Sequence, residues 1–184
     1  MNIFMLDNNP EKCAKYHNDK HTVKMILEYA QLLSTAHRIL DGVPSRVEYL
    51  TSTGKSRTKT VYTVPRNDSI LYAATHINHP SAVWVRESDN NYQWLYTTAK
   101  ELCKEYTRRY KRRHKTEDVI DALFSPPKNI PQGPMTTLPL AMPKEYQKEN
   151  PVAAYRNYYR LGKAHIAKWD RLNNTPVWFN QRQG

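Results

Sequence analysis

The segment from residue 13 to residue 40 carries apolar side chains around most of a helical circumference. At about 100° per residue, its strongly polar side chains fall into one narrow stripe, and the rest of the wheel is largely Leu, Ile, Met, Val, Ala and Tyr. Such a helix is buried on most sides and exposes a slot, not a broad polar face. With the start signal Asp7-Asn8-Asn9-Pro10 and the stop signal Gly42, the pattern predicts one long buried helix from Pro10 to about Asp41.

The remaining chain predicts a mainly α, single-domain fold around this helix. Seven of the twelve prolines lie between residues 126 and 151, which excludes a helix or a central strand there. The 184 residues suffice for one hydrophobic core, so residues 1–184 are expected to form one domain. The other expected elements are, in chain order, a β-hairpin insertion at 46–64, a short helix at 67–76, a segment capped by Ser81, a helix at about 90–115, a proline-rich connection at 125–151 and a last helix from Pro151 to about Trp169.

The chain is strongly basic, with 28 Lys and Arg against 17 Asp and Glu and a net charge of +11. This balance is typical of proteins that bind a polyanion, so we expect nucleic acid, with DNA favoured, and rank an anionic membrane surface second. No apolar run reaches about 18 residues, and the first residues lack the regions of a signal peptide. We therefore expect no membrane association, a monomer, and a cytoplasmic location, in the host cytoplasm if the gene belongs to a phage.

The polar stripe of the first helix is the strongest indication of chemistry. It groups two imidazoles, an amine and a carboxylate, from His17, His21, Lys24 and Glu28. A lysine amine beside imidazoles in a partly desolvated cleft loses its proton more readily and can act as a nucleophile, while a glutamate one turn further can act as general acid or base. The structural alternative is a solvated row held together by the i, i+4 pair of Lys24 and Glu28.

A metal site on the same helix is the weaker interpretation. His17 and His21 are spaced so that two imidazoles can hold one metal, and His76 or His79 is available to complete the set. The segment reads HNDKH instead of HExxH, and the ammonium of Lys24 disfavours a cation nearby. The two cysteines lack the spacing of a zinc site. We therefore expect no metal and no cofactor.

Two further helices carry the expected contacts with nucleic acid. Residues 100–115 hold eight Lys or Arg against two Glu, and cations of this kind contact phosphates without reading sequence. The last helix interleaves cations with Tyr, which suits stacking on unpaired bases. The candidate nucleic-acid-binding residues are Arg108, Arg109, Lys111, Arg112, Arg113, Arg156, Tyr159, Arg160 and Lys163.

Together these features resemble the phage-type pyrimidine-dimer DNA glycosylases with abasic lyase activity, the small helical enzymes often called endonuclease V. The resemblance rests on a short apolar start that leads into a buried helix, on a histidine-led segment before a basic helix that contains cysteine, and on an aromatic closing motif. The residues that carry it are His17, His21, Lys24, His79, Leu102-Cys103-Lys104 and Pro176-Val177-Trp178-Phe179. The hairpin and the proline-rich connection stand outside it as additions.

The resemblance implies an enzyme that attacks the sugar with the amine at the start of the chain and uses a helix glutamate to support the reaction. Asn2 is too bulky for efficient removal of the initiator methionine, so the free amine is expected on Met1. Asn2 is the candidate if Met1 is removed. Lys24 stands where the family has its glutamate, so either Glu28 replaces that carboxylate or Lys24 itself forms the Schiff base. The candidate catalytic residues are Lys24, Glu28, His17, His21 and Asn2.

The expected function is that of a DNA enzyme acting on a base or N-glycosidic bond of damaged or modified DNA. Two alternatives stay open: a non-catalytic nucleic-acid-binding protein in which the stripe is a structural network, and a metal-dependent nuclease built on His17 and His21. Lys24→Ala separates the first two, because an enzyme loses turnover and keeps its affinity. Activity that survives a chelator argues against the nuclease.

Overall fold

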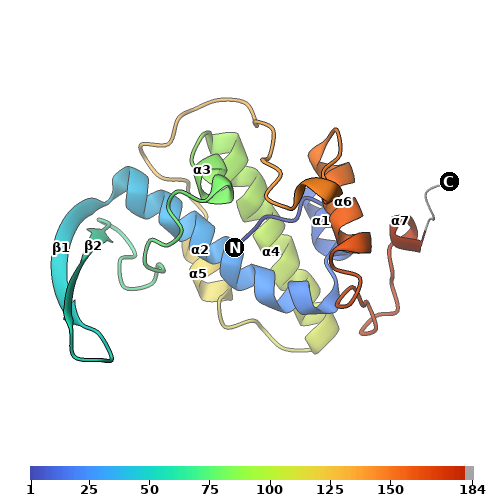
Figure 1. Cartoon of the computed structure of the whole chain (residues 1–184), viewed down its shortest axis with the longest axis horizontal. Coiled ribbons are helices and arrows are strands. Elements are labelled where there is room, and N and C mark those ends of the chain that lie inside the picture. Colours follow the sequence, from blue (N-terminus) through green and yellow to red (C-terminus); the bar gives the residue numbers. More distant parts are fainter. Residues whose placement is uncertain (181–184) are drawn as a thin grey trace.

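Two long helices form the centre of the fold. A computed structural model describes residues 1–180 of the chain. Helix α2 (Asp19–Asp41) packs against α4 (Asp89–Tyr110), and the short helix α1 (Pro10–Tyr16) packs on α4 as well. Helix α6 (Pro151–Leu161) lies toward the other end of the molecule from the hairpin (Figure 1).

Smaller elements connect and flank these helices. They are β1 (Val43–Leu50), β2 (Ser56–Thr63), α3 (Pro80–Val85), α5 (Glu117–Ala122), a short 3-10 helix η1 (Lys144–Tyr146) and α7 (Val177–Asn180). The mainly α fold with one small hairpin is therefore confirmed over the described residues. Within residues 1–180, no helix combines the length and the apolar character that crossing a membrane requires.

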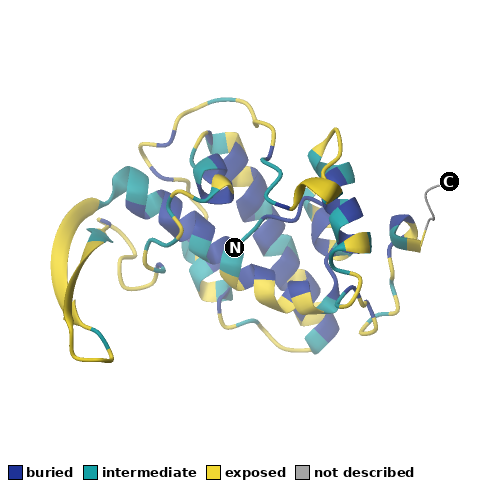
Figure 2. Cartoon of the chain, in the orientation of Figure 1, coloured by how far each residue is buried: buried dark blue, intermediate teal, exposed yellow. Residues whose placement is uncertain are grey.

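Buried apolar side chains form a contiguous cluster between the helices. The apolar start of the chain, residues 3–6, belongs to it entirely, and Figure 2 shows the buried faces of α2 and α4 that line it. Helix α4 also buries a stripe of side chains at helical spacing, namely Tyr92, Leu95, Ala99, Leu102, Cys103 and Tyr106. The start of the chain is thus a core segment, and this position fixes where its first two residues lie.

The predicted long helix from Pro10 to Asp41 is two helices, which corrects the first prediction. Helix α1 ends at Tyr16, and the backbone of His17 leaves the helical conformation with ψ 133°. Asn18 then caps α2, because its side-chain oxygen accepts the backbone N–H of His21 at 2.8 Å. The apolar wheel continues across the break, so periodicity alone does not reveal it, whereas the Asn18-Asp19 start signal does.

The predicted hairpin is present, with bounds shifted from 46–64 to 43–63. Strands β1 and β2 pair antiparallel from Val43↔Thr63 to Leu50↔Ser56. The turn contains Gly54 at φ 75°, a backbone conformation that L side chains rarely adopt. The hairpin projects from the end of α2 and is almost wholly exposed (Figures 1 and 2).

The predicted helix at 67–76 is absent, and Arg38 provides the physical reason. The guanidinium of Arg38 donates to the carbonyl groups of residues 62, 68, 71 and 72 and to the carboxylate of Asp68. The N–H groups of Tyr72 and Thr75, which would donate to the carbonyl groups of residues 68 and 71 in a helix, donate instead to the hydroxyls of Ser34 and Thr35 on α2. Asn67 also has a positive φ of 58°, which interrupts a right-handed helix.

Two helix ends and one additional short helix also differ from the sequence prediction. Helix α4 ends at Tyr110 and not near residue 115, because Lys111 adopts the left-handed conformation of a helix cap. The following short helix α5 was not predicted. Helix α6 ends at Leu161 instead of Trp169, and the cap at Gly162 closes with its N–H on the carbonyl of Tyr158. Residues 125–151 form an extended connection interrupted by η1.

Candidate active site at the start of the chain

The first two residues meet the middle of α2 at a single carboxylate. The backbone N–H of Asn2 donates to Glu28 Oε2 at 3.1 Å, and the amine of Met1 lies 3.9 Å from the same oxygen. The other oxygen, Glu28 Oε1, lies 3.1 Å from Lys24 Nζ, one helical turn away. Glu28 therefore lies between the amine at the start of the chain and the amine of a lysine.

The side chain of Asn2 fixes this arrangement from the opposite side. Its Nδ2 donates to the carbonyl of Ala141 at 2.8 Å, and its Oδ1 lies 3.0 Å from the Tyr155 hydroxyl. That hydroxyl also lies 3.0 Å from the carbonyl of Pro139. Burial raises the pKa of Tyr155 well above its usual value, so the hydroxyl stays a donor. The proline-rich connection and α6 together hold the start of the chain against α2.

The two members of the Lys24–Glu28 pair differ in exposure. The Glu28 side chain is 12% exposed, whereas that of Lys24 is 68% exposed. A carboxylate with little access to water keeps its neighbours in fixed positions, while an exposed ammonium remains free to swing toward a substrate. The Met1 side chain is 3% exposed and packs against the core. The site is therefore a firmly held carboxylate with an accessible amine beside it.

His79 is electrostatically coupled to this site, whereas the sequence suggests it only as a metal ligand and as part of the family resemblance. It caps α3, with Nδ1 accepting the backbone N–H of Ser81 at 3.2 Å. Its pKa is lowered by partial burial, and further by the positive amine at the start of the chain and by His76, against an opposing effect of Glu28. The charge of His79 is therefore coupled to those of the amine at the start of the chain and of Glu28.

His17 belongs to the core and not to this site, which corrects its assignment as a catalytic residue. The phenolic oxygen of Tyr29 accepts the N–H of Phe4 at 3.2 Å and lies 2.9 Å from His17 Nε2, while His17 Nδ1 lies 2.8 Å from the carbonyl of Cys13. Both imidazole nitrogens are thus engaged. Complete burial lowers the pKa of His17 to about 4, so the ring is neutral at pH 7.

His21 is likewise an interior residue. Its Nδ1 lies 2.5 Å from the hydroxyl of Tyr159, and its ring centroid lies 4.4 Å from that of Phe4. Burial lowers its pKa to about 3. The predicted stripe therefore divides, because its two imidazoles enter the core and only Lys24 and Glu28 reach the surface. Within residues 1–180, no cluster of His, Cys, Asp and Glu is arranged to hold a metal ion.

Arg109 and Tyr159 are also buried, which corrects their assignment to nucleic-acid binding. The Arg109 side chain is fully buried, pairs with Glu105 at 2.8 Å and with Asp19 at 3.0 Å, and donates to the carbonyl of His17. It thereby joins the end of α1 to the start of α2. Tyr159 is fully buried against His21 and offers no face to a base.

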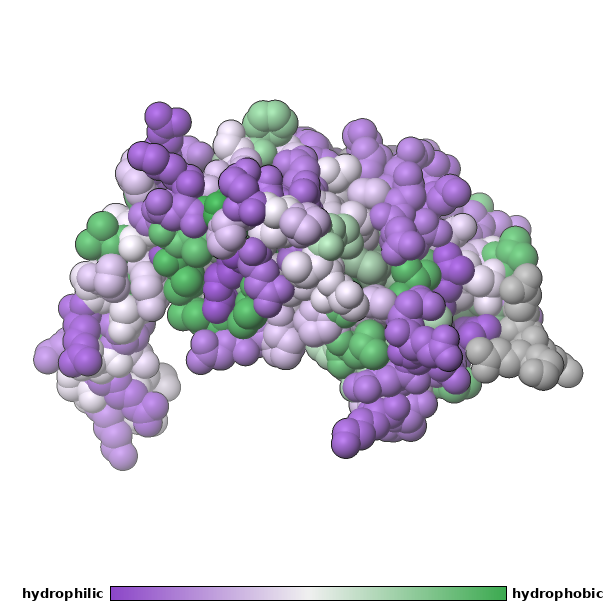
Figure 3. All heavy atoms as spheres, turned by 90° about the horizontal axis from the view of Figure 1, so that it is seen from above, coloured by the Kyte–Doolittle hydropathy of each residue, from purple (hydrophilic) through white to green (hydrophobic). Residues whose placement is uncertain are grey.

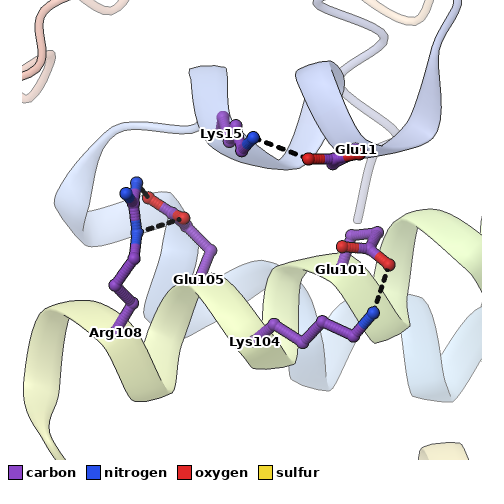
Figure 4. Close-up of a pocket in the computed structure, with 6 residues that line it drawn as sticks. All are labelled: Glu11, Lys15, Glu101, Lys104, Glu105 and Arg108. Carbon is purple, nitrogen blue, oxygen red and sulfur yellow. Dashed lines mark hydrogen bonds and ion pairs between the residues drawn. The ribbon is translucent and has the colours of Figure 1, made fainter.

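The basic end of α4 is largely neutralised by neighbouring acids. In the shallow pocket between α1 and α4, each cation pairs with an acid of its own helix: Lys15 with Glu11, Lys104 with Glu101, and Arg108 with Glu105 (Figure 4). Arg113 pairs with three acids of α5, namely Glu117, Asp118 and Asp121. Lys111 and Arg112 remain as exposed cations at this end, with Arg112 Nε donating to the Tyr106 hydroxyl at 3.0 Å.

The cations of the last helix also make contacts within the protein. Arg156 donates to the carbonyl of Leu6 at 2.7 Å, and its guanidinium lies 5.2 Å from the centroid of the Trp178 ring. Arg160 donates to the carbonyl of Trp178 at 3.4 Å. Lys163 Nζ lies 5.1 Å from the centroid of the Tyr158 ring. Much of the positive charge expected to contact DNA is therefore used to hold the C-terminal helices in place.

An amine beside a poorly hydrated carboxylate is the arrangement that an amine nucleophile requires, because the carboxylate can accept its proton. The family model for pyrimidine dimer DNA glycosylases matches residues 1–118. The chain belongs to this family of DNA repair glycosylases, which confirms the resemblance seen in the sequence and makes DNA the class of substrate. No curated protein gives a significant match to the chain, and no solved structure does.

Proposed function

We propose that this protein cleaves the N-glycosidic bond of a damaged or modified base in DNA, with the amine at the start of the chain as nucleophile and Glu28 as its proton acceptor. The observation that carries the proposal is the position of the Glu28 carboxylate, 3.1 Å from the nitrogen of Asn2 and 3.9 Å from that of Met1. Membership in the glycosylase family supports the same bond as the target.

The reaction follows from the chemistry of an amine and an acetal-like carbon. The lone pair of the neutral amine attacks C1′ of the deoxyribose, and the bond from C1′ to the base breaks, so that the base leaves with the bonding electrons and takes up a proton. Glu28 accepts the proton that the attacking nitrogen releases. The nitrogen lone pair then forms the C=N bond as the C1′–O4′ bond opens, and O4′ takes the proton held by Glu28, which leaves a protonated Schiff base between C1′ and the nitrogen and a hydroxyl at C4′. The departing base takes its own proton from water.

Two nitrogens at the start of the chain satisfy this geometry. With Met1 retained, its amine is the nucleophile, whereas removal of Met1 makes the nitrogen of Asn2 the free amine at 3.1 Å from Glu28. Lys24 is the third candidate, since its amine lies 3.1 Å from the same carboxylate and is largely exposed. In all three cases Glu28 has the same role.

Borohydride trapping tests the proposal directly. The purified protein is incubated with duplex DNA carrying abasic or ultraviolet-damaged sites, reduced with borohydride, digested and analysed by mass spectrometry. We expect a covalent adduct on the amine of Met1 or Asn2, which Lys24→Ala preserves. An adduct on Lys24 would transfer the nucleophile to the lysine. Tight, salt-sensitive binding without any adduct would overturn the amine mechanism.

A further inference from the structure

The hairpin carries positive charge that nothing in the described protein neutralises. It holds four cations, Arg46, Lys55, Arg57 and Lys59, against the single acid Glu48. Among residues 1–180, none of these four forms an ion pair, in contrast to the cations of α4, most of which pair with an acid. All of β1 and most of β2 are exposed. Like Lys111 and Arg112 at the end of α4, the cations of the hairpin therefore remain available to a polyanion, and the hairpin carries four of them on one exposed element.

The register divides these charges between the two faces of the ribbon. Cross-strand partners share a face, so Val47↔Lys59 and Tyr49↔Arg57 lie on one side, where Lys59 Nζ is 5.2 Å from the centroid of the Tyr49 ring. We call this side the basic face. Arg46↔Thr60 and Glu48↔Thr58 lie on the other side, where a cation and an acid offset each other.

We propose that the basic face of the hairpin lies in the major groove of the duplex that flanks the reacting nucleotide, with Arg57 and Lys59 contacting phosphates along the groove. A two-stranded ribbon fits the major groove, which is about 12 Å wide. Eight residues of strand extend roughly 26 Å, which corresponds to about 8 base pairs at 3.4 Å each. Figure 3 shows the surface hollowed between the hairpin at the left and a hydrophilic lobe, a shape that suits a duplex.

A membrane or an apolar protein partner fits the same hairpin less well. Its two most exposed apolar side chains are Val43 at 69% and Leu50 at 73%. They lie at opposite ends of β1 and, by the register, on opposite faces. Val43 shares the basic face with Val47 and Tyr49, but Lys59 and Arg57 stand opposite these two. Charge therefore lies beside the apolar side chains, whereas insertion into a membrane interface or an apolar groove requires a continuous apolar strip.

Binding to undamaged duplex DNA tests the inference with a matched pair of variants. Arg57→Gln removes a charge from the basic face, and Arg46→Gln removes the same charge from the opposite face of the same hairpin. The double variant Arg57→Gln/Lys59→Gln loses two phosphate contacts. Because each contact contributes about 0.9 to the slope of log K against log salt, we expect the slope to become shallower by about 1.8. The affinity at low salt should weaken about tenfold. Arg46→Gln is expected to leave the slope of the wild-type protein unchanged.

Duplex length gives a second measurement. Shortening the DNA by about 8 base pairs on the hairpin side should weaken the wild-type protein and leave Arg57→Gln/Lys59→Gln unaffected. An unchanged slope in that double variant, or equal losses in Arg46→Gln and Arg57→Gln, would overturn the inference.

The inference rests on the proposed function only for the position of the reacting nucleotide. Undamaged DNA reports no chemistry, so the two can fail separately. If the glycosylase mechanism is wrong, no variant gives a borohydride adduct. If the hairpin does not contact DNA, the hairpin variants bind DNA with the affinity and the salt dependence of the wild-type protein. At saturating protein, the hairpin variants should give the wild-type yield of adduct.

Discussion

At the scale of single residues, Glu28 is the carboxylate on which the proposed mechanism depends. In the proposed mechanism it accepts the proton of the attacking nitrogen, and it lies within 3.9 Å of the nitrogens of Met1, Asn2 and Lys24. An amide in its place keeps a hydrogen-bond acceptor for the N–H of Asn2 but cannot take a proton, so the loss is chemical and not structural.

We predict that Glu28→Gln lowers the single-turnover rate of base release by about 10²- to 10⁴-fold, the usual contribution of general acid–base catalysis, with DNA affinity unchanged. Glu11→Gln is the matched control, because Glu11 also pairs with a lysine four residues away, on α1. A Glu28→Gln enzyme with a rate within twofold of wild type would contradict the role of this carboxylate.

Arg109 shows how a cation expected at a DNA interface becomes a structural residue. Removing it leaves Glu105, which is 4% exposed, as a buried charge without its closest partner. We predict that Arg109→Ala lowers the free energy of unfolding by about 3–5 kcal/mol in urea titrations. Arg108→Ala removes a half-exposed partner of the same glutamate and should cost about 1 kcal/mol or less. Equal effects of the two substitutions would refute this difference.

At the scale of elements, the sequence pattern predicts an element well where local signals are complete. The hairpin, the apolar stripe of α4 and the proline-rich connection follow from β-branched runs, helical spacing and proline density. The helix predicted at 67–76 is absent, because Arg38 of α2, which is distant in the sequence, donates hydrogen bonds to carbonyl groups of this segment. The break at Asn18 was missed because the apolar period runs across it.

The cap at Asn18 can be measured as an element in its own right. We predict that Asn18→Ala lowers the free energy of unfolding by about 1–2 kcal/mol, because the N–H of His21 loses its acceptor at the start of α2. Asn18→Ser keeps a capping oxygen and should recover most of this loss. Chemical denaturation followed by far-ultraviolet circular dichroism gives both values, and identical losses in the two variants would argue against a capping role.

At the scale of the whole molecule, net charge predicted the partner but not the place of contact. A charge of +11 favours a polyanion wherever the cations lie. The cluster at 100–115 is the densest in the sequence, yet folding brings the acids of α5 and of α4 itself beside it. The site at Glu28 could not be predicted from the sequence either, because the residues that meet there, 2, 28, 141 and 155, are distant in the chain.

The two buried imidazoles predict how the stability of the molecule depends on pH. Their pKa values fall from the ordinary 6.5 to about 4 for His17 and about 3 for His21. Between about pH 6.5 and pH 4 the unfolded chain therefore binds protons that the native protein does not. The stabilising contribution is complete above pH 6.5 and decreases as the pH falls, by up to about 1.4 kcal/mol per pH unit for each histidine.

Urea unfolding at pH 7, 6 and 5 measures this loss, and histidine ring resonances in NMR spectra assign it. Both rings should remain neutral at pH 5 in the native protein. The exposed His165 supplies the control, because His165→Gln should leave the pH profile unchanged. A ring of His17 or His21 that becomes protonated near pH 6.5 would contradict the burial described here.

The position of the first two residues has a practical consequence. The Met1 side chain is 3% exposed, and Asn2 bonds at once to α2, the proline-rich connection and α6. An affinity tag or fusion partner joined ahead of Met1 converts the amine into an amide. The added residues would also have to pass close to the Glu28 carboxylate, because the nitrogen of Met1 lies 3.9 Å from it. If the amine at the start of the chain is the nucleophile, as proposed, recombinant protein carrying such a tag should release no base, so material for these assays should carry its tag after residue 184. Base release that survives the tag would point to Lys24 as the nucleophile.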